Sequence, residues 1–166
     1  MARRVGKLCG GLLAPAAQKE LARQGLGVPS SLLAGPQLFA VRALDCESGL
    51  ERRYQRHYVN IDRHAFDAWL VSLATDHCDY RPGWRFTGLD QGAPSPLLHF
   101  RTSAGGVASV AARLVVGADG AGSAVRRAAF PTDSPTRYVA LQASFAEEHS
   151  EACYGAVFAT ALTNYY

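Results

Sequence analysis

The stretch RLVVGADGAGSAVRR, from Arg113 to Arg127, predicts a strand, a glycine turn and a helix in immediate succession. Its apolar run, residues 114–116, is short and rich in β-branched side chains, which is typical of a buried parallel strand. Glycines then indicate a tight turn, and Ser123 is a suitable N-cap for a helix over residues 124–129. Asp119 would therefore lie just past the carboxyl end of a sheet strand, where ligands bind in open α/β sheets.

This turn predicts a ligand site that Asp119 and Gly120 border. Backbone N–H groups and a helix N-terminus aimed at one point suit a phosphate or a sugar hydroxyl, and a glycine at position 120 lets the backbone come close to such a ligand. The alternative from the residues alone is a buried strand followed by an ordinary glycine turn. A hydrolase is not indicated, because Ser123 is not in G-x-S-x-G and no histidine is placed to serve it.

Length and composition are those of one ordinary globular domain. The chain has 166 residues, of which 48% are hydrophobic and 19% charged, and this composition excludes a disordered chain. The formal net charge of +3 is small and the arginines are spread along the sequence, so we expect no nucleic-acid partner. No apolar run approaches the ~18 residues that a membrane helix needs, so we expect no integral membrane segment.

The cysteine pattern predicts no structural metal site, although four cysteines could form two disulfides. Cys9, Cys46, Cys78 and Cys153 lie far apart, without a CxxC pair or a histidine at zinc-finger spacing. Residues 1–17 lack the continuous apolar region of a secretory signal. We therefore expect reduced cysteines and a cytoplasmic location.

Regular elements are expected along most of the remaining chain. Pro15 suits the first turn of a helix over residues 16–24, and Asp62 can cap a helix over residues 63–74. Charges on both faces of the stretch 50–61 indicate an edge strand. Alternation of apolar and polar residues, interrupted by turn residues, predicts strands over residues 38–45, 50–61, 80–90, 97–103, 107–112 and 136–145.

The opening stretch also resembles the DG motif of the flavoprotein hydroxylase superfamily. That motif is a charged residue, three apolar residues, two small ones, Asp-Gly, and then a serine and an arginine, which correspond here to Arg113, residues 114–118, Asp119, Gly120, Ser123 and Arg126. Gly122 stands where the superfamily usually has a polar or charged residue. The resemblance implies that Asp119 and Gly120 lie beside bound FAD and help to bind a nicotinamide donor.

A second stretch, KLCGGLLAPAAQKELARQGL over residues 7–26, resembles the geranylgeranyl reductase family. In that family a Lys-x-Cys-Gly-Gly run lies near the flavin ring, so the resemblance implies that Cys9, Gly10 and Gly11 bind the cofactor. Cys9 would be the catalytic nucleophile or proton donor; the alternative is a small apolar loop residue. Arg63 matches a basic residue at a strand-to-helix entry, and its alternative is a solvated arginine at a helix start.

Together these resemblances imply an α/β fold that is incomplete. Residues 1–135 would form a partial FAD/NAD(P)-binding, Rossmann-like domain with a β-meander, and residues 136–166 would begin an antiparallel substrate-domain sheet. The sequence contains no G-x-G-x-x-G after a strand, the fingerprint that holds a pyrophosphate. We therefore expect an internal fragment or a truncated product, with an unpaired sheet edge through which copies could associate.

Two classes of function follow from these observations. The first is an FAD-dependent oxidoreductase, of reductase or monooxygenase type, that acts on a small apolar or prenyl-like substrate and takes electrons from NAD(P)H in a complete relative. The second is a non-enzymatic remnant or interaction module that keeps the core of the fold without bound flavin.

Overall fold

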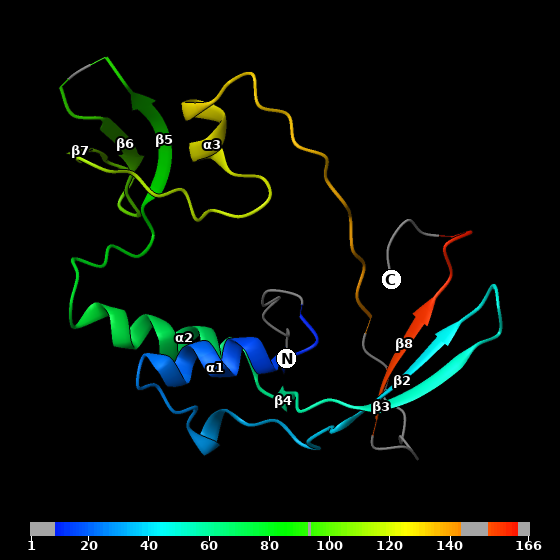
Figure 1. The fold of residues 1–166 in the computed structure, drawn as a ribbon. Helices are drawn as coiled ribbons and strands as arrows, with labels where there is room; N and C mark the ends of the chain where they lie inside the picture. The colour runs from blue at the N-terminus through cyan, green and yellow to red at the C-terminus, as the bar shows by residue number, and fades with distance from the viewer. Residues whose placement is uncertain (1–8, 93, 144–152, 163–166) are drawn as a thin grey trace. The chain divides into compact units, whose positions relative to one another are not determined.

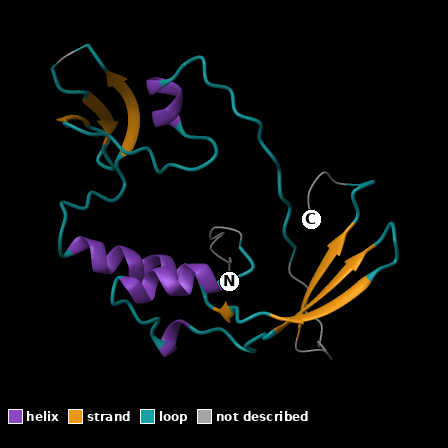
Figure 2. Ribbon diagram, in the orientation of Figure 1, coloured by secondary structure: helices purple, strands orange, loops and turns teal. Residues whose placement is uncertain are grey.

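The structure is a computed structural model that describes residues 9–92, 94–143 and 153–162. Within these residues it is a mixed α/β protein with three small sheets and three α-helices (Figures 1 and 2). The chain divides into two compact units, Met1–His77 with Gln142–Tyr166, and Cys78–Leu141. The mixed α/β class that we expected is therefore confirmed, whereas a Rossmann-like arrangement is not.

The two longer helices both belong to the first unit and form where the sequence predicts them. Helix α1, Pro15–Arg23, has its proline in the first turn, where the missing N–H leaves no hydrogen bond unmade. Helix α2, Arg63–Thr75, begins after Asp62, whose side chain accepts the N–H of Ala65 at 3.0 Å. Both helices contribute side chains to one apolar cluster.

That apolar cluster is the core of the first unit. A short 3-10 helix, η1 (Ser30–Leu32), brings Leu32 against Ile61 and Phe66, and all three side chains are buried. The ring of Trp69 packs against Phe66, with 5.6 Å between the ring centroids. Partly buried side chains from α1, α2 and the short strands surround these three residues.

Two sheets complete the first unit. Strand β1 (Leu12–Leu13) pairs with β4 (Val59–Asn60) in antiparallel fashion. The other sheet has the order β3-β2-β8 and is formed by β2 (Ala40–Asp45), β3 (Glu51–Gln55) and β8 (Cys153–Phe158). The strands predicted over residues 38–45 and 50–61 thus form the antiparallel pair β2 and β3, but the second predicted strand breaks after β3 and resumes only in β4. Strand β8 pairs with β2 in parallel fashion.

The second unit is built on the predicted β-meander. Strands β5 (Arg85–Asp90), β6 (Leu97–Arg101) and β7 (Val107–Ala111) pair in sequence order, and each pair is antiparallel. Helix α3 (Ala124–Ala129) packs against β5. The N-cap that we predicted is confirmed, since Oγ of Ser123 accepts an N–H from the first turn of α3.

The predicted buried strand at residues 114–116 is wrong. The segment forms no strand, and the side chains of Leu114 and Val116 are 80% and 78% exposed. A parallel strand is stable only when neighbouring strands satisfy its backbone groups, and the described residues place no strand beside this segment. The strand predicted over residues 136–145 is also not formed over 136–143, for the same reason; residues 144 and 145 lie outside the described residues.

Candidate functional site

Two of the predicted site residues, Cys9 and Arg63, meet in the first unit. Nη1 of Arg63 donates to Sγ of Cys9 across 3.6 Å, while Nε of the same guanidinium donates to Oδ1 of Asp67 at 2.8 Å. The hydrogen bond with Asp67 is the main reason why the pKa of Arg63 is raised. The first turn of α2 thus holds a permanent positive charge beside an exposed thiol.

The two glycines next to Cys9 have different surroundings. Gly11 has φ 75°, its carbonyl accepts the N–H of Ile61 at 2.8 Å, and a Cβ at this position would lie 2.5 Å from the Ile61 carbonyl oxygen. Packing against the chain itself therefore requires glycine at position 11. Gly10 has nothing within 4 Å of the place where its Cβ would be, so its backbone is open to a ligand.

In the second unit, the carboxylate of Asp119 binds the beginning of α3. Oδ2 accepts the N–H groups of Ala124 at 2.6 Å and of Val125 at 3.2 Å, and Oδ1 accepts the hydroxyl of Ser123. Oγ of Ser123 in turn accepts the N–H of Arg126 at 2.9 Å. The hydroxyl of Ser123 is the largest of the causes that lower the pKa of Asp119. The amides that we expected to face a phosphate are therefore already bonded within the chain.

Gly120 forms the turn that brings Asp119 back to the helix. Its φ of 83° lies in the left-handed region, which favours glycine. It also borders a cavity of about 370 Å³ together with Val125 and Phe130. Gly120 and Asp119 belong to one unit, and Cys9, the two glycines that follow it and Arg63 belong to the other. Contact of these six residues with a cofactor stays a prediction.

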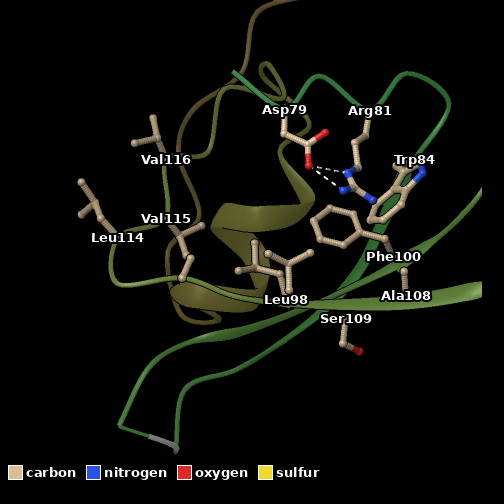
Figure 3. A pocket seen from close by; sticks show the side chains of 12 residues that line it. Asp79, Arg81, Trp84, Leu98, Phe100, Ala108, Ser109, Leu114, Val115 and Val116 are labelled. Carbon is tan, nitrogen blue, oxygen red and sulfur yellow. Dashed lines mark hydrogen bonds and ion pairs between the residues drawn. The ribbon is translucent and has the colours of Figure 1, made fainter. Parts of the chain in front are cut away.

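The second unit also contains an aromatic cavity that sequence reasoning missed. The cavity has a volume of about 820 Å³ and lies on the β-meander. Figure 3 shows Arg81 between the carboxylate of Asp79 and the ring of Trp84. Nη2 of Arg81 lies 2.5 Å from Oδ2 of Asp79, and the guanidinium carbon lies 4.8 Å from the centroid of the Trp84 ring. The ring of Phe100 lies 5.6 Å from that of Trp84. Because Asp79 neutralises Arg81, this cavity offers a ligand chiefly an apolar wall.

A further cavity, of about 420 Å³, lies in the first unit on one face of the β3-β2-β8 sheet. The register places Tyr54 and Tyr154 on either side of Val41. The ring of Tyr58 meets that of Tyr154 edge-on at 6.3 Å, and the guanidinium of Arg56 lies 5.9 Å from the Tyr58 ring centroid. Alternation along residues 54–58 already indicates that Tyr54, Arg56 and Tyr58 share a face. The sequence contains no signal for the pairing of β8 with β2.

The described residues contain neither a metal-binding cluster nor a membrane-spanning helix. In that part of the chain, no group of three or more His, Cys, Asp and Glu side chains is arranged to hold a metal ion. Its helices are all too short or too polar to cross a bilayer.

Comparison with known proteins relates the chain to curated bacterial proteins of greater length. No known protein-family model matches it. Protein CbrA of Escherichia coli strain K12 and Protein CbrA of Shigella sonnei strain Ss046 are each 41% identical to it over 168 residues. Each alignment covers 96% of this chain and 45% of the relative, so the chain spans slightly less than half the length of these proteins.

These findings correct the assignment to the geranylgeranyl reductase family. The relatives carry the name CbrA, and nothing in the comparisons points to a geranylgeranyl reductase. The resemblance rested on two short glycine-bearing motifs. In this fold both have a structural explanation, since Gly11 is required by its contact with Ile61 and Asp119 caps a helix.

Proposed function

We propose that the chain is part of an FAD-dependent oxidoreductase in which the loop of Cys9, Gly10 and Gly11 lies beside the flavin. The observation that carries this proposal is the 3.6 Å contact between Sγ of Cys9 and Nη1 of Arg63. It places a proton donor and a fixed positive charge next to the open backbone of Gly10. A planar ring can rest on such a surface because no side chain intervenes at position 10.

The loop leads into α1, and the N-terminus of this helix is suited to an anion. Ala14 provides no side-chain cap there, and the first turn contains no acidic residue. The positive end of the helix dipole therefore remains available to a phosphate. By contrast, Asp62 caps α2, and Ser123 with Asp119 caps α3.

FAD fits the described residues only in part. The Cys9–Gly11 loop, Arg63 and the start of α1 suit the ring and one phosphate group. A pyrophosphate is usually bound by a glycine-rich turn between a strand and an uncapped helix. The described residues contain no such turn. We propose that the remaining contacts come from the part of the longer relatives that lies outside the matched 168 residues.

Bound FAD would supply hydride transfer or, with oxygen, hydroxylation, while the protein orients the substrate and excludes water. In this proposal Arg63 stabilises negative charge near the loop, and Cys9 holds a proton at Sγ. The hydrogen bond between Arg63 and Asp67 keeps the guanidinium in place. A small apolar substrate, NAD(P)H as electron donor and a cytoplasmic location belong to the same proposal.

The test uses the full-length Protein CbrA of Escherichia coli strain K12. We expect the purified protein to be yellow and to release stoichiometric FAD on denaturation, identified by chromatography. Substitution of the residues that align with Cys9 and Arg63 should then lower the rate of flavin reduction or reoxidation. A matched change at the position aligned with Arg53, which lies on β3, should leave these rates unchanged. A colourless protein that binds no added FAD would overturn the proposal.

A second candidate, a non-enzymatic interaction module, is favoured by exposed apolar side chains in the second unit. Leu114, Val116, Val139 and Leu141 are all at least 78% exposed. Such side chains are typical of surfaces that another chain covers. A colourless full-length relative would favour this candidate over the first, so the same spectrum separates the two.

A further inference from the structure

The cavity on the β3-β2-β8 sheet has an aromatic rim around an apolar floor. Val41 forms the floor and is 2% exposed. Tyr54 and Tyr154 flank it on the two neighbouring strands and keep 47% and 41% of their surface exposed. Tyr58 closes one side with its ring edge-on to Tyr154.

Arg56 supplies positive charge at this rim. Its guanidinium lies over the ring of Tyr58, and in the described part of the chain it forms no ion pair with a carboxylate. The other arginines of the sheet differ in this respect, since Arg42 and Arg53 both bind the carboxylate of Glu51. Among the described residues, Arg56 is therefore the guanidinium lining this cavity that no carboxylate neutralises; its interaction with the side chain of Tyr58 raises its pKa.

We propose that this cavity binds a planar aromatic carboxylate. Three tyrosine rings offer stacking and edge-on contacts that favour a flat ring system over a flexible chain. A guanidinium at the edge of an apolar surface binds a carboxylate through two parallel hydrogen bonds. The volume of about 420 Å³ lies in the range of small-molecule sites and accommodates a bicyclic ring.

This inference does not depend on flavin. None of the residues that line this cavity belongs to the Cys9–Gly11 loop, and Arg63 does not line it either. Binding of an aromatic carboxylate can be measured without FAD, so a negative result for one proposal does not contradict the other.

The probe is 2-naphthoate, added to the intact chain with 13C-labelled tyrosine rings. Saturable shifts are expected at Tyr54, Tyr58 and Tyr154, with Tyr80 of the second unit as the internal control. The dissociation constant should be roughly 1 mM, as the affinity per atom of small ligands suggests. The neutral isostere 2-naphthamide and the flexible chain decanoate should both bind at least about fivefold more weakly.

Two arginine variants decide the role of the charge. Arg56→Gln should weaken naphthoate binding about tenfold, because it removes a charge-assisted pair. Arg53→Gln makes the same charge change on the other face of β3 and should leave binding unchanged. Tyr154→Phe keeps the ring and should retain binding, whereas Tyr154→Ser should not. The spectrum of each variant without ligand shows whether the sheet is still folded.

Three results would overturn the inference. One is the absence of saturable shifts at the three tyrosines of the folded wild-type chain. Another is equal binding of naphthoate and naphthamide, which would mean that Arg56 does not select the charge. The third is an equal loss in the Arg53 and Arg56 variants, which would indicate a nonspecific effect of net charge.

Discussion

Oδ2 of Asp119 accepts the backbone N–H of Ala124 at 2.6 Å, and this contact joins the glycine turn to the first residue of α3. The same carboxylate accepts the hydroxyl of Ser123 through its other oxygen. Asp119, which we expected to border a ligand, is therefore a structural cap. The cap can be tested by itself, because its hydrogen bonds lie within the chain.

We expect the cap to weaken in acid. Hydrogen bonds, chiefly from Ser123, lower the pKa of Asp119 below its ordinary value. A carboxyl group whose pKa is lower in the folded state contributes stability that is present above the unfolded pKa and is lost as the pH falls through the folded one. The amide resonance of Ala124 should therefore shift below pH ~4, and Asp119→Asn should abolish that shift. An amide that does not titrate in the wild type would argue against the cap.

Loss of the second capping group should destabilise the second unit measurably. Ser123 is buried, and its Oγ accepts the N–H of Arg126 at 2.9 Å. Ser123→Ala should lower the free energy of unfolding by about 1 kcal/mol, because the cap is lost. Ser123→Thr keeps a hydroxyl group at the cap and should retain most of that stability. Urea unfolding in a Trp69→Phe background, where Trp84 reports on this unit, measures the difference. Equal stability of the alanine and threonine variants would contradict the assignment.

Gly10 and Gly11 should respond very differently to the same substitution. A methyl group at Gly11 would meet the Ile61 carbonyl oxygen at 2.5 Å in a left-handed backbone conformation, so Gly11→Ala should cost about 2–4 kcal/mol. Gly10→Ala meets open space and should change the unfolding free energy by less than about 0.5 kcal/mol. Trp69 fluorescence in a Trp84→Phe background reports on this unit. Similar costs for the two variants would show that the loop packs differently.

Leu114 and Val116 should contribute to association rather than to stability. Changing both to serine should leave the unfolding free energy within about 0.5 kcal/mol of the wild type, because both side chains are exposed. It should also reduce self-association in sedimentation velocity. Val115→Ser is the matched control. The Val115 side chain lines the two cavities described above in the second unit, so this change should lower the unfolding free energy by more than the double variant does. A large loss of stability in the double variant would show that the segment is buried.

The chain by itself should bind FAD more weakly than micromolar. Micromolar affinity requires about 8 kcal/mol of net binding free energy. In the proposed arrangement the Cys9 loop would contact only one side of the cofactor, and association must first offset several kcal/mol of lost translational and rotational freedom. Titration with FAD, followed by flavin fluorescence, tests this expectation. Flavin mononucleotide, which has one phosphate and no pyrophosphate, should bind about equally well; a strong preference for FAD would mean that the chain also binds the second phosphate.

Local sequence was sufficient for the elements whose signals lie within a few residues. Asp62 and Ser123 are recognisable as helix caps because a cap acts on backbone amides two or three positions away. The β-meander followed from alternation and short turns, since antiparallel neighbours in sequence pair directly. The same local signals predicted Cys9 in a loop and Arg63 at the start of a helix, but they did not indicate that the two side chains are in contact.

The tertiary structure decided everything that depends on a distant partner. The apolar run at 114–116 has the composition of a buried strand, yet it forms none, because strand formation requires a neighbour whose backbone groups complete the hydrogen bonds. The contact between Cys9 and Arg63 joins residues 54 positions apart. The tyrosine–arginine cavity exists only because β8 pairs with β2 and carries Tyr154 to Tyr58, a pairing that no local pattern specifies.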